Sequence, residues 1–409
     1  YMDSSIILTY AIPFFLLLII IEFSYGVIKG KNNYRLNDAL TSLSLGLISR
    51  FVPLLGLGFQ YVVYKYVAEY YNLKLLNLED VWVWIFAFIL YDICYYWMHR
   101  IHHEVKVFWA THVVHHHGED FNLATALRQT SSGFLWKWVF FLPMFIIGVP
   151  PEVYVSVAGV NLVYQFWVHT EHVGRLGFLE YILITPSNHR VHHAQNDDYL
   201  DANYGGVFIL WDRIFGTFID ERKDLKPVYG TVKPLKSFNP FWANIEVFYQ
   251  MFLDSYRTKK LNDKLYVWFS PPGWRPEDVK EKYPLRKNDL NSFEKYDPQI
   301  SNRQKIFGFF QFAMINALTV IMLFNMNKFA YTEMLSVAAL VITLAISNSF
   351  MLDGKTYASK VEVLRLIGVL AFLYFGFFTS FTYLILAHSI IALTVIIFLL
   401  KPDNYELAS

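Results

Sequence analysis

The sequence predicts an all-α, polytopic membrane protein with about nine transmembrane helices. Three observations support this prediction. Apolar residues make up 55% of the 409 positions and charged residues only 17%, a balance typical of membrane proteins. The mean hydropathy is positive, at +0.31. The apolar residues also gather into long runs, and a helix of about 20 such residues crosses a bilayer.

Nine apolar runs approach that length. The first has no basic segment before it and no small-residue cleavage site, so we expect a retained helix rather than a signal peptide. The second is long and contains Pro53, which permits a kink or two half-spans. The nine runs lie near residues 6–24, 40–70, 82–98, 133–149, 152–168, 306–325, 330–350, 361–378 and 381–400.

The orientation of these helices follows from Lys and Arg in the short loops, which favour the cytoplasmic side. If the N-terminus is outside and the second run crosses once, nearly all loops that contain Lys and Arg lie on the same side of the membrane. The opposite loops hold little beyond Lys74 and Lys328. Splitting the second run would break this pattern, so we expect a single crossing and a cytoplasmic C-terminus. The cytoplasmic loops then contain Lys29, Lys31, Arg35, Arg100, Lys106, Arg222, Lys223, Arg303, Lys305, Lys355, Lys360 and Lys401.

Four regions follow from this pattern. Within residues 221–304, one predicted helix has an apolar face, which predicts a helix on the membrane surface. The residues of this face are Ile245, Phe248, Met251 and Phe252. A helix packed on its own domain is the alternative. The regions are N-terminal transmembrane helices over 1–80, a catalytic core over 81–220, a cytoplasmic or interfacial segment over 221–304, and C-terminal transmembrane helices over 305–409.

Composition also excludes several classes of function. The net charge of +1 gives no reason to expect nucleic acid as a partner. Cys94 is the single cysteine, so the chain can form neither an internal disulfide nor a cysteine-ligated iron–sulfur cluster. The segment Gly56-Leu57-Gly58 lacks the third glycine of a dinucleotide-binding motif and lies in an apolar run.

The histidines are the most informative residues, because twelve of the thirteen lie between positions 99 and 193. Most fall three or four residues apart, a spacing that puts side chains on one face of a helix. One such motif would be weak evidence, but two HxxHH motifs and one HxxxH at one membrane face predict a metal site. The nine expected ligands are His99, His103, His112, His115, His116, His169, His189, His192 and His193.

The remaining histidines are ambiguous to different degrees. His102 and His117 flank expected ligands, and adjacency alone does not distinguish His102 from His103. His172 follows His169 by three residues and could be a tenth ligand. His388 stands alone in the last apolar run, where a structural role is expected.

Nine nitrogens shared by two metal ions give four or five each, with a position left open. Structural zinc closes its shell with four ligands, so a purely structural zinc protein is disfavoured. Imidazole suits iron, zinc and copper. An all-histidine site beside a lipid-filled membrane favours di-iron with O₂ as co-substrate. A metal transporter would instead need polar ligands along a path at mid-membrane, which the later apolar runs do not provide.

Acidic residues near the histidines are candidates for orienting them or for catalysis. Asp92 lies seven residues before His99 inside an apolar run, where a carboxylate is costly. Its alternative role is a hydrogen bond to a neighbouring helix. Glu104 follows His103 and could contact a ligand or cofactor, with simple surface exposure as the alternative. Weaker candidates are Glu171, Asp201, Asn203 and Asp212.

These motifs resemble the fatty acid hydroxylase / sterol desaturase superfamily of membrane di-iron oxygenases, and more closely its alkylglycerol monooxygenase branch. The similarity spans about residues 80–277, and the apolar C-terminal third is also similar to this branch. Asn188 and His172 depart from the pattern of the relatives, which leaves the ninth and tenth ligands open. The matching strings are 99–104, 164–171, 185–193, 201–206, 211–218, 239–244 and 271–276.

The resemblance implies di-iron ligation by the two HxxHH groups and the HxxxH group, with His169 as an additional ligand and Glu104 as a characteristic glutamate. It implies hydroxylation of the ether-linked alkyl carbon of a glycerol ether lipid, giving a fatty aldehyde and a glycerol derivative. Tetrahydrobiopterin would be the external reductant, although no pterin-binding residue is evident, and an electron-donor protein is the alternative. The lipid would enter from the membrane. A sterol or fatty-acyl hydroxylase or desaturase with the same di-iron site is the alternative function.

Overall fold

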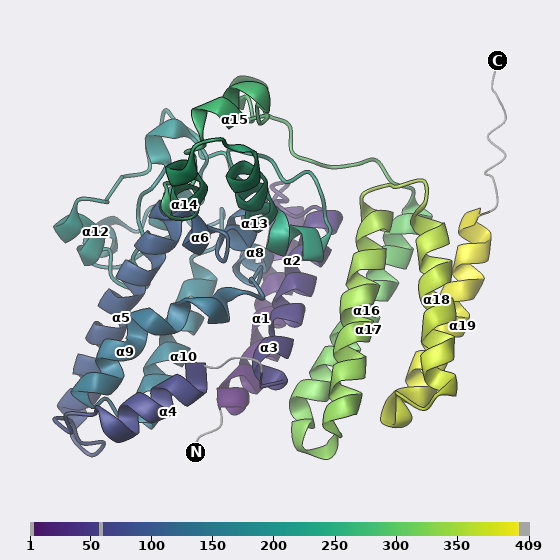
Figure 1. Ribbon diagram of the computed structural model, residues 1–409, viewed down its shortest axis with the longest axis horizontal. Helices are drawn as coiled ribbons and strands as arrows, with labels where there is room; N and C mark the ends of the chain where they lie inside the picture. Colours follow the sequence, from purple (N-terminus) through teal and green to yellow (C-terminus); the bar gives the residue numbers. More distant parts are fainter. Residues whose placement is uncertain (1–3, 57–59, 401–409) are drawn as a thin grey trace. The chain divides into compact units, whose positions relative to one another are not determined.

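The computed structural model describes residues 4–56 and 60–400, and throughout these residues the fold is helical (Figure 1). Within them, extended pairing is limited to two isolated β-bridges, between Leu183 and Phe208 and between Ala194 and Tyr229. The predicted all-α class is therefore confirmed. The chain divides into two compact units. We call residues 1–34, 56–235 and 244–295 the histidine unit, and residues 35–55, 236–243 and 296–409 the C-terminal unit.

The histidine unit contains the long helix α5 and many short helices. Its core is apolar and joins α5, α9 and α10 through residues such as Met98, Met144 and Val153. Its α-helices are α1 (Ser4–Ile28), α4 (Gln60–Tyr70), α5 (Val81–Glu104), α6 (Lys106–Trp109), α7 (Val113–His116), α8 (Leu123–Ala126), α9 (Lys137–Ile147), α10 (Pro151–Trp167), α11 (Pro186–His192), α12 (Leu210–Phe215), most of α13 (Pro240–Arg257), α14 (Leu261–Phe269) and α15 (Glu277–Lys282).

The C-terminal unit is built from long apolar helices around a core that includes Ile315, Val341 and Ile385. Its helices are α2 (Leu36–Ser49), α3 (Phe51–Leu54), α16 (Asn302–Phe324), α17 (Tyr331–Leu352), α18 (Ala358–Tyr374) and α19 (Thr382–Leu400). The 3₁₀ helices of the two units are η1 (Gly133–Leu135), η2 (Gly177–Tyr181), η3 (Asp197–Tyr199), η4 (Leu290–Ser292), η5 (Met326–Lys328) and η6 (Thr379–Phe381).

Four helical segments of the described chain are long and apolar enough to cross a membrane. They are Val81–Glu104, Asn302–Phe324, Tyr331–Leu352 and Thr379–Phe398. On α5, Trp82, Ile85 and Ile89 are exposed, as expected of side chains that face lipid. These segments make the protein an integral membrane protein.

Other apolar runs form shorter helices than a single crossing needs. The run at 133–149 gives α9, whose 11 residues span about 16 Å against a hydrocarbon core of about 30 Å. Gly148 ends α9 in a left-handed conformation, with φ +106°. The run at 40–70 is divided into α2, α3 and α4 rather than forming one helix, with Pro53 in α3 and positions 57–59 outside the described residues.

The predicted amphipathic helix exists as α13, but most of its apolar face packs on its own unit. Met251 is buried and Phe248 partly buried against Ala110 of the α6 end and Val267 of α14. Only Phe252 of that face is largely exposed. The alternative, a helix packed on its own domain, therefore describes this face better than a membrane-surface helix.

Candidate metal centre

The nine predicted ligands converge into two buried groups. The five-histidine group contains His99, His103, His112, His116 and His192, and the four-histidine group contains His115, His169, His189 and His193. Within each group, one ring nitrogen from every member lies within 4.8 Å of all the others. All nine side chains are buried.

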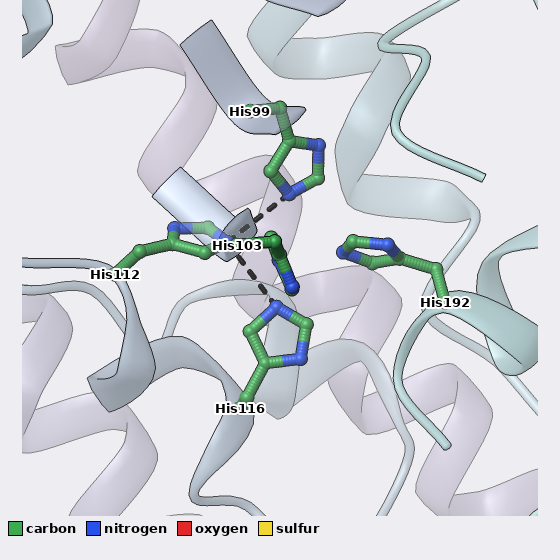
Figure 2. Close-up of side chains that lie close together, drawn as sticks. All are labelled: His99, His103, His112, His116 and His192. Carbon is green, nitrogen blue, oxygen red and sulfur yellow. Dashed lines mark hydrogen bonds between the residues drawn. The ribbon is translucent and has the colours of Figure 1, made fainter. Parts of the chain in front are cut away.

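Figure 2 shows the five-histidine group with its rings turned toward one another. Helix α5 provides His99 and His103, while His112 and His116 come from the start and end of the α7 turn. His112 Nε2 lies 3.0 Å from His99 Nε2 and 3.2 Å from His116 Nε2. His103 Nε2 is buried and has no hydrogen-bond partner among the described residues. Such crowded nitrogen atoms, without carboxylates between them, fit a bound metal ion.

The four-histidine group is built in the same way. His169 Nε2 lies 3.2 Å from His115 Nε2 and 2.9 Å from His189 Nε2. His193 Nε2 lies 3.2 Å from His189 Nε2. Helix α11 holds His189 and His193 one turn apart, and His169 follows the end of α10. The two groups adjoin, because the rings of His116 and His193 stack at 4.3 Å between centroids.

The start of α11 is fixed by a capping box. Pro186 occupies the first helical position. The Thr185 side chain accepts from the backbone N–H of Asn188, and the Asn188 side chain accepts from the backbone N–H of Thr185. Asn188 thus serves as a capping residue. His172 lies outside both histidine groups.

Backbone carbonyls orient four of the rings through Nδ1. A carbonyl only accepts, so each contacting Nδ1 must carry the proton and each Nε2 is left with a free electron pair for a metal. His99 Nδ1 donates to Tyr204 O at 2.9 Å, and His192 Nδ1 donates to Ala202 O at 2.9 Å. The corresponding bonds in the other group run from His115 Nδ1 to Arg128 O at 3.1 Å and from His169 Nδ1 to Gln165 O at 2.7 Å.

Electrostatics favour neutral imidazoles, the form that binds metal. Burial lowers the pKa of His192 to about 4 and that of His169 to about 3. Burial and the neighbouring imidazoles hold the pKa values of His112, His116 and His189 well below the usual range. All these residues are therefore neutral at pH 7.

The turn at 201–205 supplies the two carbonyls that orient His99 and His192. Asp201 and Asn203 both have φ +57°, a left-handed conformation that Asp and Asn tolerate better than most residues. Asp212 accepts from Tyr204 N at 2.7 Å and Gly205 N at 2.8 Å, and burial raises its pKa to about 6. These contacts fix the direction of the carbonyls beside the histidines.

Asp92 lies outside both histidine groups and is fully buried. Its carboxylate accepts four hydrogen bonds, from Asn161 Nδ2 and Trp211 Nε1 and from the N–H groups of Val207 and Phe208, at 2.8–3.0 Å. A Cβ on Gly206 would lie only 2.7 Å from Asp92 Oδ1, so glycine allows this close approach. These contacts fit a role in holding the turn that precedes α12.

Glu104 ends α5 and also lies outside both groups. It pairs with Arg100 at 2.8 Å, and its side chain is 39% exposed. His102, the neighbour that sequence could not distinguish from His103, donates from Nδ1 to Met98 O and packs against Phe108 and Phe140. His103 is the one that joins a histidine group.

Tyr204 is a further site residue, which the histidine and acidic patterns of the sequence do not indicate. It is fully buried, and its ring centroid lies 5.3 Å from that of His103 and 6.0 Å from that of His192. Its hydroxyl has no hydrogen-bond partner within the described chain. Its place in the string Asp201–Gly206 was the available signal. The backbone carbonyls that orient the rings could not be predicted from the sequence, because every residue has a backbone carbonyl.

Comparison with known proteins defines the class. Residues 84–217 match the fatty acid hydroxylase family model, a segment that contains both histidine groups. The chain is 30% identical to human lathosterol oxidase over 35% of its own length and 47% of that enzyme. A search of solved structures found no match. The histidine unit thus carries the domain of a membrane oxidoreductase of the fatty acid hydroxylase class.

More extensive similarity defines the family. The chain is 38% identical to human alkylglycerol monooxygenase, over 90% of this chain and 82% of that enzyme. It is 36% identical to alkylglycerol monooxygenase of Xenopus tropicalis, over 87% and 79%. The chain belongs to the alkylglycerol monooxygenase family.

Proposed function

We propose that the protein is a membrane di-iron monooxygenase that hydroxylates the ether-linked alkyl carbon of glycerol ether lipids. The observation that carries the proposal is the pair of buried histidine groups inside the fatty acid hydroxylase domain. Membership of the alkylglycerol monooxygenase family supports the choice of substrate.

The nine histidines would hold the two irons, one in the five-histidine group and one in the four-histidine group. Neutral imidazoles suit iron, although they also bind zinc and copper. Bound there, the irons would supply the activation of O₂. The protein's own part is to keep the nitrogen electron pairs pointed inward, through the carbonyls of Tyr204, Ala202, Arg128 and Gln165, and to keep water away by burying every ring.

The proposed reaction balances with an external two-electron donor. One oxygen atom of O₂ enters the C–H bond beside the ether oxygen, and the other leaves as water with two electrons and two protons. The product is a hemiacetal, which breaks its C–O bond to give a fatty aldehyde and a free glycerol hydroxyl. We propose tetrahydrobiopterin as the donor, with an electron-donor protein as the partner if pterin is not used. The lipid substrate would come from the membrane.

The proposed topology places the N-terminus outside and the metal centre and C-terminus in the cytoplasm. The support is the bias of Lys and Arg toward the loops on one side. About nine crossings would require the shorter apolar helices to enter the bilayer beside the four long ones. Labelling of cysteines introduced at Lys31 and Lys328, in the Cys94→Ser background, tests the orientation, because the two positions should label from opposite sides.

Product analysis by mass spectrometry tests the activity. Purified protein loaded with Fe(II) would receive 1-O-alkylglycerol, tetrahydrobiopterin and air, and we expect fatty aldehyde with free glycerol. The His192→Ala variant is the control, since its five-histidine group loses a ring. Absence of aldehyde from wild-type protein that holds two irons would contradict the substrate and donor, and sterols, acyl lipids and protein donors would then be tested. Fewer than two metals per chain would contradict the centre itself.

A further inference from the structure

A glutamate of the N-terminal helix lies beside the metal centre. Glu22 of α1 is 7% exposed, and its carboxylate accepts hydrogen bonds from three separate segments. The donors are the Tyr34 hydroxyl, the Leu123 N–H at 2.8 Å and the Thr170 hydroxyl at 2.5 Å. The proposed reaction uses neither Glu22 nor these donors.

Two of the three donors lie in segments that support the four-histidine group. Thr170 directly follows His169. Leu123 begins α8, and the Arg128 carbonyl just beyond that helix accepts from His115 Nδ1 at 3.1 Å. Glu22 therefore connects the segment that contains His169 with the segment whose Arg128 carbonyl orients His115.

Further contacts reinforce the same connection. Phe121, two residues before Leu123, stacks on His169 with centroids 5.6 Å apart, and its carbonyl accepts from Asn33 Nδ2 at 2.9 Å. Phe15 of α1 stacks on Phe166 of α10 at 4.1 Å, three residues before His169. The N-terminal segment thus contacts Phe121, which stacks on His169, and Phe166, which belongs to the helix that precedes His169.

The five-histidine group has different supports. His99 and His192 are oriented by carbonyls of the 201–205 turn, and His103 belongs to α5. None of the three described donors to Glu22 lies in the 201–205 turn or in α5. Loss of the Glu22 contacts should therefore affect the two groups unequally.

We infer that Glu22 is a positioning residue for the four-histidine group, and that its bonds to Thr170 and α8 determine whether the second metal binds. The inference rests on the proposed di-iron function. A glutamine in its place would retain one acceptor oxygen, and its NH₂ group could not accept the bonds that the second carboxylate oxygen of Glu22 accepts. The Leu123 N–H and the Thr170 hydroxyl would then compete for one acceptor, and both segments could shift.

The test measures iron per chain and Mössbauer spectra of purified protein, alongside melting temperature. Glu22→Gln and Thr170→Val should each lower the iron content from two toward one and remove one spectral component. Thr170→Ser keeps the hydroxyl and should retain both irons. Glu333→Gln is a matched control, because Glu333 is equally buried at 7% and accepts from Ser380 N, Ser380 Oγ and Thr379 Oγ1 in the C-terminal unit. It should also retain both.

Each outcome decides the inference. Two irons in both Glu22→Gln and Thr170→Val would overturn it, as would equal loss of iron from both groups. If Glu22→Gln does not fold, Thr170→Val alone decides, because it removes one hydroxyl and little volume. Wild-type protein with fewer than two metals would instead contradict the proposed function, so the two failures are distinguishable.

Discussion

His115 and His116 are neighbours in α7, yet their rings belong to different histidine groups. His115 Nε2 lies 3.2 Å from His169 Nε2, whereas His116 Nε2 lies 3.2 Å from His112 Nε2. Successive helical residues point about 100° apart, so a single turn can serve two centres. His192 and His193 are divided in the same way.

This division gives the HxxHH motif a geometric meaning. The outer pair, four residues apart, shares one group, and the middle histidine joins the other. At α7 and its N-cap, the pair His112 and His116 belongs to the five-histidine group, and at α11 and its C-cap, the pair His189 and His193 belongs to the four-histidine group. The middle histidine of each HxxHH motif thus joins the group that contains the outer pair of the other motif, and the two motifs link the two groups.

The adjacent residues His102 and His103 provide the sharpest test of the ligand assignment. His103→Ala should lose metal from the five-histidine group, and activity should fall by more than the roughly 10–100-fold that the loss of an outer-shell partner of a metal ligand costs. His102→Ala removes a similar buried ring outside both groups and should keep both metals. Metal analysis and aldehyde production measure the difference. Equal metal loss in the two variants would contradict the assignment.

Asp92 should matter mainly for stability. In Asp92→Ala, the N–H groups of Val207 and Phe208 and the indole of Trp211 lose their acceptor. A buried donor left unsatisfied costs about 1–3 kcal/mol, so the melting temperature should fall by several degrees. Thermal unfolding in detergent measures the change, with Asp224→Ala as the control because that side chain is 71% exposed. An unchanged melting temperature with abolished turnover would instead point to a direct catalytic role.

The long apolar elements and the identity of the converging residues were predictable from sequence. The run at 82–98 appears as α5, and all nine expected ligands lie in the two histidine groups. Hydropathy could not predict that α9 stops after 11 residues, because it counts apolar side chains without knowing where a helix ends. Nor could spacing assign His115 and His116 to different groups, since that depends on which distant segments pack against each side of α7.

Glu104 tests whether the exposed end of α5 takes part in catalysis. Its surface ion pair with Arg100 should contribute about 1 kcal/mol or less to stability. Glu104→Ala should therefore fold normally and keep both metals, since the residue lies outside both groups. If Glu104 contacts substrate or pterin, turnover should fall while metal content stays constant. Unchanged turnover in that variant would make Glu104 a surface residue.

Acid should destabilise the metal-free protein in a defined pH window. The pKa of His192 in the folded chain is about 4 and that of His169 about 3, whereas an unfolded histidine titrates near about 6.5. Between these values the unfolded chain binds protons that the folded chain does not. The free energy of unfolding therefore falls as pH decreases from about 6.5 toward 4, by up to about 1.4 kcal/mol per pH unit for each such histidine.

Melting temperatures of metal-free protein at pH 7 and pH 5 measure this, and His192→Gln should show a weaker dependence because glutamine does not titrate. Equal melting temperatures at the two pH values would mean that the histidines titrate in the folded protein as they do in the unfolded chain, which would contradict a lowered pKa in the buried centre.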